Sequence, residues 1–142
     1  MSVRTAVRYS ISVSVLALTA ATLAGEPKEG TVRALDVKVE RPAKGRVTQP
    51  VAIRSADEMA KAIADEAAVA AVKKAVDFEK EQVVYFSWSG SGQDKITFES
   101  SGGAAPTVTF TYTPGLTRDL RPHARLFALP KDATYKVVTA GR

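Results

Sequence analysis

The sequence predicts an α+β fold in which a curved antiparallel sheet of about five to seven short strands packs against one helix or a broken pair of helices. Two observations support this class. A run of strong helix formers follows a capping motif at residue 55, and short segments of alternating apolar and polar residues lie on both sides of it, separated by polar or glycine-containing turns. We therefore expect a single α+β domain over residues 47–142.

The first 24 residues differ in character from the rest of the chain. Arg4 and Arg8 precede an uncharged apolar run of 14 residues that ends at Ala24, before a polar stretch. This pattern is typical of a secretory signal peptide, and the run is shorter than the roughly 20 residues that span a bilayer. We expect Sec-type export with cleavage after Ala24, or after Ala21, and a periplasmic or secreted mature chain without a membrane span. Retention as an uncleaved N-terminal anchor is the alternative.

The composition excludes several classes of partner and cofactor. The chain has 20 Lys+Arg, 15 Asp+Glu and a net charge of +5; because Arg4 and Arg8 leave with the signal peptide, 18 bases and 15 acids remain, a mature charge of +3. The basic residues form no stripe, so we expect no nucleic-acid partner. The absence of cysteine excludes disulfides and thiolate sites, and one histidine among scattered acids lacks the spacing of metal ligands. We expect no metal and no other cofactor.

Two short strands are predicted before the helix. Residues 25–46 form a charged lead that we expect to be flexible, and it can contain a short strand where Leu35, Val37 and Val39 alternate with charged residues. Residues 51–53 form a second short apolar run.

The helix is predicted from its start and from its periodicity. Ser55 and Glu58 match a capping box, in which a hydroxyl and a carboxylate satisfy the free amides at a helix start. The apolar residues that follow have a roughly helical spacing and are Met59, Ile63, Val69, Val72 and Val76. Because Asp65 and Glu66 can start a second helix after a bend, we expect either one helix or a broken pair.

The strands after the helix are marked by alternation with a period of two. Residues 82–88 are apolar on both faces, which favours an interior strand covered on one side by the helix. Alternating runs at 96–99 and 107–113 and apolar runs at 126–129 and 135–138 complete the set. The turns between successive runs predict antiparallel hairpins.

The first candidate site is the segment WSGSGQDK, from Trp88 to Lys95, between two predicted strands. Gly90 and Gly92 let several backbone amides turn toward one point, where Lys95 can help to hold an anion or a carboxylate. The alternative is a wide hairpin turn in which Asp94 caps backbone amides. The spacing matches neither a P-loop nor a nucleophile elbow.

The second candidate site is the long loop that follows the next strand. Pro122 keeps Arg121 out of the helical region, so Asp119, Arg121 and His123 should point to the same side of an extended chain. One interpretation is an internal salt bridge that pins the loop. The other is that Arg118 and Arg121 bind a carboxylate or phosphate, while His123 adds a pH-sensitive donor.

These features predict an exported, non-enzymatic binding or accessory module that uses the loops 88–95 and 113–123. The expected ligand-binding residues are Trp88, Ser89, Ser91, Asp94, Lys95, Arg118, Asp119, Arg121 and His123.

Two alternatives stay open at the level of sequence. One is a small extracytoplasmic serine-dependent hydrolase, because Ser91, His123 and either Asp119 or Asp94 supply the residue types of acyl transfer. The other is a purely structural envelope protein.

Three stretches of the chain carry a resemblance to known proteins: VDF at 76–78, FSWSGSGQDK at 86–95 and FTYTPGLTRDLRPHARLFALPK at 110–131. They resemble a family of small exported bacterial proteins, common in planctomycetes, for which no activity is established. More distantly, the order of elements is similar to that in the C-terminal domain of PrcB-type accessory subunits, which associate with an extracytoplasmic protease. The chain lacks the Thr-Gly-Gly-Tyr pattern of that family's glycine-rich hairpin. The resemblance implies the fold and, as a partner, an envelope protein or protease.

Overall fold

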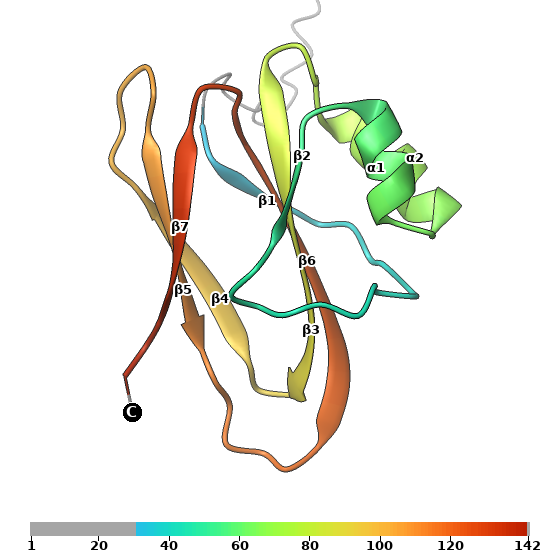
Figure 1. Cartoon of the computed structure of the whole chain (residues 1–142), viewed down its shortest axis with the longest axis vertical. Helices are drawn as coiled ribbons and strands as arrows, with labels where there is room; N and C mark the ends of the chain where they lie inside the picture. Colours follow the sequence, from blue (N-terminus) through green and yellow to red (C-terminus); the bar gives the residue numbers. More distant parts are fainter. Residues whose placement is uncertain (1–30, 142) are drawn as a thin grey trace, which may run out of the picture.

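The computed structural model describes residues 31–141, and the predicted signal peptide lies outside these described residues. Figure 1 shows three layers side by side: a pair of helices, a four-stranded sheet and a three-stranded sheet. The elements are β1 (Arg33–Leu35), β2 (Val51–Ile53), α1 (Ala56–Ala62), α2 (Glu66–Ala75), β3 (Glu81–Ser91), β4 (Lys95–Ser100), β5 (Thr107–Thr113), β6 (Leu120–Pro130) and β7 (Thr134–Thr139). Neither of these helices has the length and apolar character needed to cross a membrane.

The α+β class is confirmed, but the strands divide between two sheets where the sequence pattern predicts one curved sheet. The first sheet has the order β1-β6-β3-β2 with antiparallel neighbours, and the second has the order β4-β5-β7, in which β5 and β7 are parallel. The connections after β3, β5 and β6 carry the chain from one sheet to the other, so β4 and β5 form a hairpin while β3–β4, β5–β6 and β6–β7 do not. The reason lies in β3, whose residues 81–88 are all buried, because each face of the strand needs its own covering layer.

Of the two alternatives for the helical segment, one helix or a broken pair, the structure has the broken pair. Ser55 Oγ accepts a hydrogen bond from the Glu58 amide at 3.2 Å, and the Glu58 carboxylate accepts one from the Arg54 amide at 2.7 Å. Asp65 starts the second helix by accepting from the amides of Ala67 and Ala68. The helices pack on one face of the four-stranded sheet through a buried cluster that includes Ile53, Met59, Ile63, Val69, Val72, Val76, Val83, Tyr85, Leu126 and Ala128.

A second core fills the space between the two sheets. Its centre is formed by Phe86 of β3, Phe110 of β5 and Phe127 of β6. The ring centroids lie 5.0 Å apart for Phe86 and Phe110, 5.7 Å for Phe86 and Phe127, and 4.9 Å for Phe110 and Phe127. The tilted and edge-on arrangements are those that aromatic rings prefer. Beyond Trp88, the last residues of β3 are less buried, and they continue to the end of the sandwich where the turn to β4 begins.

The first strand lies earlier in the chain than the alternation predicts. β1 pairs with β6 only from Arg33 to Leu35. Beyond Leu35 the chain approaches the helices, where Val39 is buried and the Glu40 amide donates to Asp65 Oδ2 at 2.9 Å. Packing against the helices therefore ends the pairing with β6.

Candidate functional site

The two predicted loops lie side by side at one end of the sandwich, at the bottom of Figure 1. We call residues 91–95 and 113–121 together the tip. Three of the hydrogen bonds that join its two parts run from a backbone amide of one part to a side chain of the other: Thr117 N to Ser91 Oγ (3.2 Å), Gly92 N to Asp119 Oδ1 (3.1 Å) and Gly115 N to Asp94 Oδ1 (2.7 Å). The hydroxyls of Ser91 and Thr117 form a further hydrogen bond between the two parts. The folding of the chain therefore turns two separate sequence candidates into one surface.

Asp94 is the buried residue of the tip, with 9% of its surface exposed. Its carboxylate accepts hydrogen bonds from Trp88 Nε1 at 2.9 Å, Tyr112 OH at 2.9 Å and Gly115 N at 2.7 Å. Burial raises the pKa of Asp94, but the hydrogen bonds from Gly115, Trp88 and Tyr112 outweigh it, so the pKa lies below its ordinary value. Asp94 is thus an ionised group that ties together β3, β5 and the loop after β5. The amide that it caps belongs to that loop, whereas the sequence suggests a cap within its own turn.

Trp88 and His123 support the turn after β3. Trp88 is 5% exposed and stacks on His123, its direct partner on β6, with ring centroids 4.8 Å apart and ring planes 15° apart. His123 Nε2 lies 2.7 Å from the carbonyl oxygen of Ser91. Because a carbonyl oxygen can only accept, this nitrogen carries a proton and donates it. Both aromatic side chains therefore hold the end of β3 in place.

Asp119, Arg121 and His123 lie on one side of the extended chain, as their spacing predicts, and all three contact the turn after β3. Asp119 Oδ2 forms an ion pair with Arg121 Nε at 2.5 Å, and the arginine side chain is 68% exposed. Hydrogen bonds from the Thr117 side chain and from the Gly92 amide lower the pKa of Asp119 to about 2. The salt bridge is therefore local, and it is the bond to Gly92 that pins the loop.

The Ser91 hydroxyl is also part of this support. Its oxygen accepts from the amides of Gln93 and Thr117, each at 3.2 Å, and it shares a short hydrogen bond with the Thr117 hydroxyl. His123 approaches the Ser91 carbonyl, and no hydrogen bond within residues 31–141 joins His123 to Asp119. The residue types of acyl transfer are close together without the chain of hydrogen bonds from nucleophile to base to acid that the reaction uses.

In residues 115–120, residues that bond to the turn after β3 alternate with residues that do not. The anchored residues are Gly115, Thr117 and Asp119. The residues between them are exposed: Leu116 by 83%, Leu120 by 78%, and Arg118 likewise to a large degree. We call Leu116, Arg118 and Leu120 the outer row. Sequence reasoning identified Arg118 and missed both leucines, although the alternation in GLTRDL is the signal that indicates them.

The remaining predicted residues lie at the edges of the tip. Ser89 and Lys95 are exposed. A shallow depression of about 550 Å³ lies beside Lys95 and Leu116, and Gly92, Gln93 and residues 113–115 complete its lining. Within residues 31–141 no group of three or more histidine, aspartate or glutamate side chains is arranged to hold a metal ion.

The predicted site residues therefore divide by position. Trp88, Ser91, Asp94 and His123 support the tip from within, and Asp119 pins its loop. The groups available for contact are the outer row with Ser89, Lys95 and Arg121. No protein-family model, no curated protein and no solved structure matches this chain.

Proposed function

We propose that the protein is an exported, non-enzymatic binding module and that the tip is its binding surface. The observation that carries this proposal is the outer row, in which two leucines and an arginine are held outward by the hydrogen bonds of their neighbours. Exposed side chains contribute little to the stability of the free protein. Their fixed backbone, however, lowers the entropy cost of forming a complex.

The charges of the tip favour an anionic partner. Asp94 is buried, and Asp119 and Arg121 neutralise each other in an ion pair, so the cations without an acidic partner among the described residues are Lys95 and Arg118. Arg118 has neither a hydrogen bond nor an ion pair within residues 31–141. Guanidinium groups bind carboxylates and phosphates with two parallel hydrogen bonds, so Arg118 is the group best placed to recognise such an anion.

The same geometry favours binding over hydrolysis. A Ser91 nucleophile would have to leave its hydrogen bonds with Gln93 and Thr117, and His123 would have to turn Nε2 away from the Ser91 carbonyl. Both groups already have a structural role in the tip. This supports the non-enzymatic proposal over the serine-dependent alternative.

Export and location belong to the same proposal. The basic start and apolar run of residues 1–24 support a Sec-type signal peptide and a periplasmic or secreted chain. The partner is then a component of the cell envelope, and the similarity to accessory subunits makes a protease one candidate. Mass spectrometry of the purified protein tests the export step, because cleavage after Ala24 gives a chain that begins at Gly25 and cleavage after Ala21 gives one that begins at Thr22.

The binding surface is tested by capture from a detergent-free envelope fraction on the immobilised protein. We compare the wild type with the double variant Leu116→Ser/Leu120→Ser and with Val138→Ser, a matched control whose side chain is 40% exposed on β7. We expect the captured material to fall roughly tenfold for the tip variant and to be unchanged for the control. All thermal midpoints should agree, because exposed substitutions have small effects on stability. Capture by the tip variant at the level of the wild type would refute the tip as the binding surface.

A further inference from the structure

We infer that the partner of the tip is an anionic lipid surface, into which Leu116 and Leu120 insert while Arg118 pairs with a lipid phosphate between them. This inference rests on the proposed binding function and names the chemistry of the partner. It follows from the exposure and charge of the outer row and from the small number of exposed apolar side chains.

The outer row is exposed and its backbone is held. Leu116 is 83% and Leu120 is 78% exposed, Arg118 is exposed as well, and the residues that alternate with them, Thr117 and Asp119, bond to the turn after β3. The bonds of Gly115 to Asp94 and of Asp119 to Gly92 fix the backbone on both sides of Arg118. The Cα atoms of the two leucines are separated by at most about 14 Å, because position 120 is four residues along the chain from position 116.

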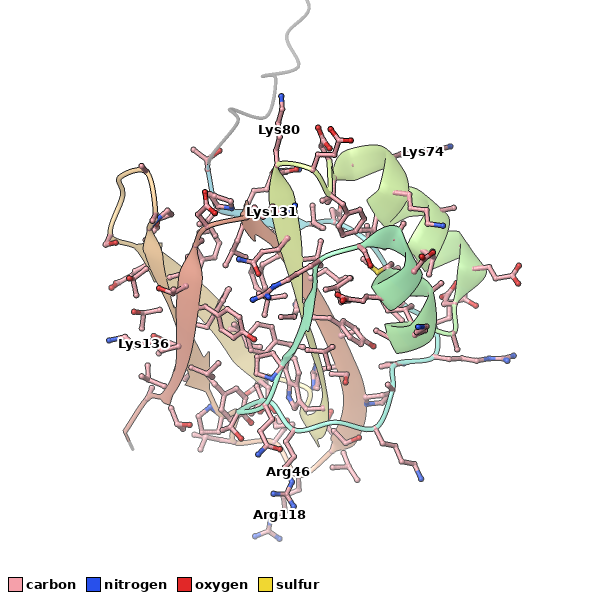
Figure 2. The ribbon with its side chains drawn as sticks, turned by 45° about the horizontal axis from the view of Figure 1, so that its top comes forward. Arg46, Lys74, Lys80, Arg118, Lys131 and Lys136 are labelled. Carbon is pink, nitrogen blue, oxygen red and sulfur yellow. The ribbon has the colours of Figure 1, made fainter. Side chains whose placement is uncertain are left out.

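The charge around the leucines is complementary to an anionic headgroup layer. Lys95 and Arg118 are exposed cations without an acidic partner in the part of the chain that the structure describes, and the half-buried acid of the tip, Asp119, and Arg121 neutralise each other in an ion pair. Figure 2 shows Arg118 projecting from the end of the molecule opposite Lys80 and Lys74, so its charge lies at the leading end of the tip. Basic side chains next to exposed leucines are the combination by which proteins lie on anionic bilayers.

The small number of exposed apolar side chains favours a bilayer over a protein surface. Figure 1 shows the tip as the loops at one end of the sandwich. A stable protein interface buries about 800 Å² on each side and is centred on aromatic or arginine anchors in pockets. The aromatic side chains of Trp88 and Tyr112 are both turned inward to Asp94, and Trp88 is 5% exposed. Two protruding aliphatic side chains with cations beside them need no matching pocket in a deformable headgroup layer.

The test uses the absence of cysteine from the chain, which allows a single probe to be placed at will. Leu116→Cys carries a nitrobenzoxadiazole fluorophore, whose emission shifts to the blue when it leaves water, and Lys136→Cys on the outer face of β7 carries the same probe as a control. Each full-length protein is mixed with vesicles of phosphatidylcholine alone or of phosphatidylcholine with phosphatidylglycerol. The local readout distinguishes insertion of the tip from attachment through any other part of the chain.

We expect the probe at position 116 to shift to the blue and to become protected from aqueous iodide only with vesicles that contain phosphatidylglycerol, while the probe at position 136 stays in water. In the Leu116→Cys background, Arg118→Glu and Leu120→Ser should each weaken the vesicle titration roughly tenfold, and Val138→Ser should leave it unchanged. Added salt should weaken binding further, because exposed charges are screened.

Three results would overturn the lipid inference. The first is a probe at position 116 that stays in water with both kinds of vesicle. The second is an equal shift of the probes at positions 116 and 136, and the third is equal binding to neutral and anionic vesicles. If the tip variants still lose capture of envelope material in that case, the proposed binding function stands with a protein as partner. If that capture is also unaffected, both proposals fall together.

Discussion

Removing the Asp94 carboxylate should destabilise the whole fold, although Asp94 lies in a turn near the surface. In Asp94→Ala, the indole Nε1 of Trp88 loses its acceptor while the ring stays buried with 5% exposure. The Gly115 amide and the Tyr112 hydroxyl lose the same carboxylate. The substitution therefore releases the contact that joins β3, β5 and the loop after β5.

The size of the effect follows from the burial of each donor. A buried donor without an acceptor costs about 1–3 kcal/mol, and hydrogen bonds to charged groups are each worth about 1.5–3 kcal/mol. Gly115 and Tyr112 are half-buried and can turn partly to water, so we count the Trp88 bond in full and the others in part. The sum is about 2–4 kcal/mol, or roughly 10 °C in thermal midpoint for a domain of this size.

The conservative variant separates charge from shape. In Asp94→Asn one amide oxygen can still accept from Trp88 and Tyr112, but the amide NH2 then faces the Gly115 N–H, and two donors meet. We expect a loss of about 1–2 kcal/mol. The pKa of Asp94 is lowered in the folded state, so its ionisation stabilises the protein above its ordinary value of 3.8, and this contribution is lost as the pH falls below that value. Asp94→Asn should remove that part of the pH dependence.

Urea unfolding followed by circular dichroism measures these differences, and the fluorescence of Trp88, the single tryptophan, reports on the site itself. Asp132→Ala, in the exposed turn between β6 and β7, is the matched control and should change stability by less than about 0.5 kcal/mol. A loss for Asp94→Ala no greater than that of the control would show that the carboxylate does not hold the tip together.

Three further substitutions test other parts of the structure. Gln82→Ala removes the buried amide that donates to three carbonyl oxygens of residues 130–133, at 3.2, 3.2 and 2.8 Å, and should cost about 2 kcal/mol in urea unfolding; a change below about 0.5 kcal/mol would contradict this role. Asp119→Asn should flatten the loss of stability that the wild type shows as the pH falls from 3.8 toward about 2, because the depressed pKa of Asp119 stabilises the fold only while the group is ionised; identical acid titrations of the two proteins would contradict the bond to Gly92. A fluorophosphonate probe should label neither the wild type nor Ser91→Ala, and labelling of the wild type that disappears in the variant would restore the hydrolase alternative.

The local parts of the fold could be predicted because each has its own short-range signal. The capping pair Ser55 and Glu58 indicated the start of α1, and Asp65 indicated the break before α2. The apolar residues on both faces of β3 indicated that it lies inside the protein. The division into two sheets could not be predicted in the same way, because alternation with a period of two is the same whether a strand pairs within one sheet or another. The parallel pairing of β5 with β7 depends on contacts that no local pattern records.

The sequence predicted the two loops of the candidate site. It did not predict which of their residues support the tip and which are available to contact a partner. From the sequence, Trp88 and Asp94 are residue types that could bind a ligand. The structure shows that they form a hydrogen bond with each other inside the protein. Leu116 and Leu120 differ from the expectation in the other direction. An isolated leucine in a loop more often packs on the core, so the sequence did not indicate that these two are exposed. Their exposure becomes evident only when the bonds of the residues beside them are known.

Because different residues support the tip and are available to contact a partner, one set of variants can measure both roles. Asp119→Asn and Asp94→Asn loosen the backbone that carries the outer row, so any loss of binding that they cause should come with a loss of stability. Arg118→Ala removes a side chain that has no partner within residues 31–141, so it should weaken binding while the free energy of unfolding stays the same. A tip that served only to close the end of the sandwich would show the reverse: stability would depend on Asp94 and Asp119, and no property of the protein would depend on Arg118. Plotting the change in vesicle binding against the change in stability for these three variants therefore distinguishes a binding surface from a structural cap.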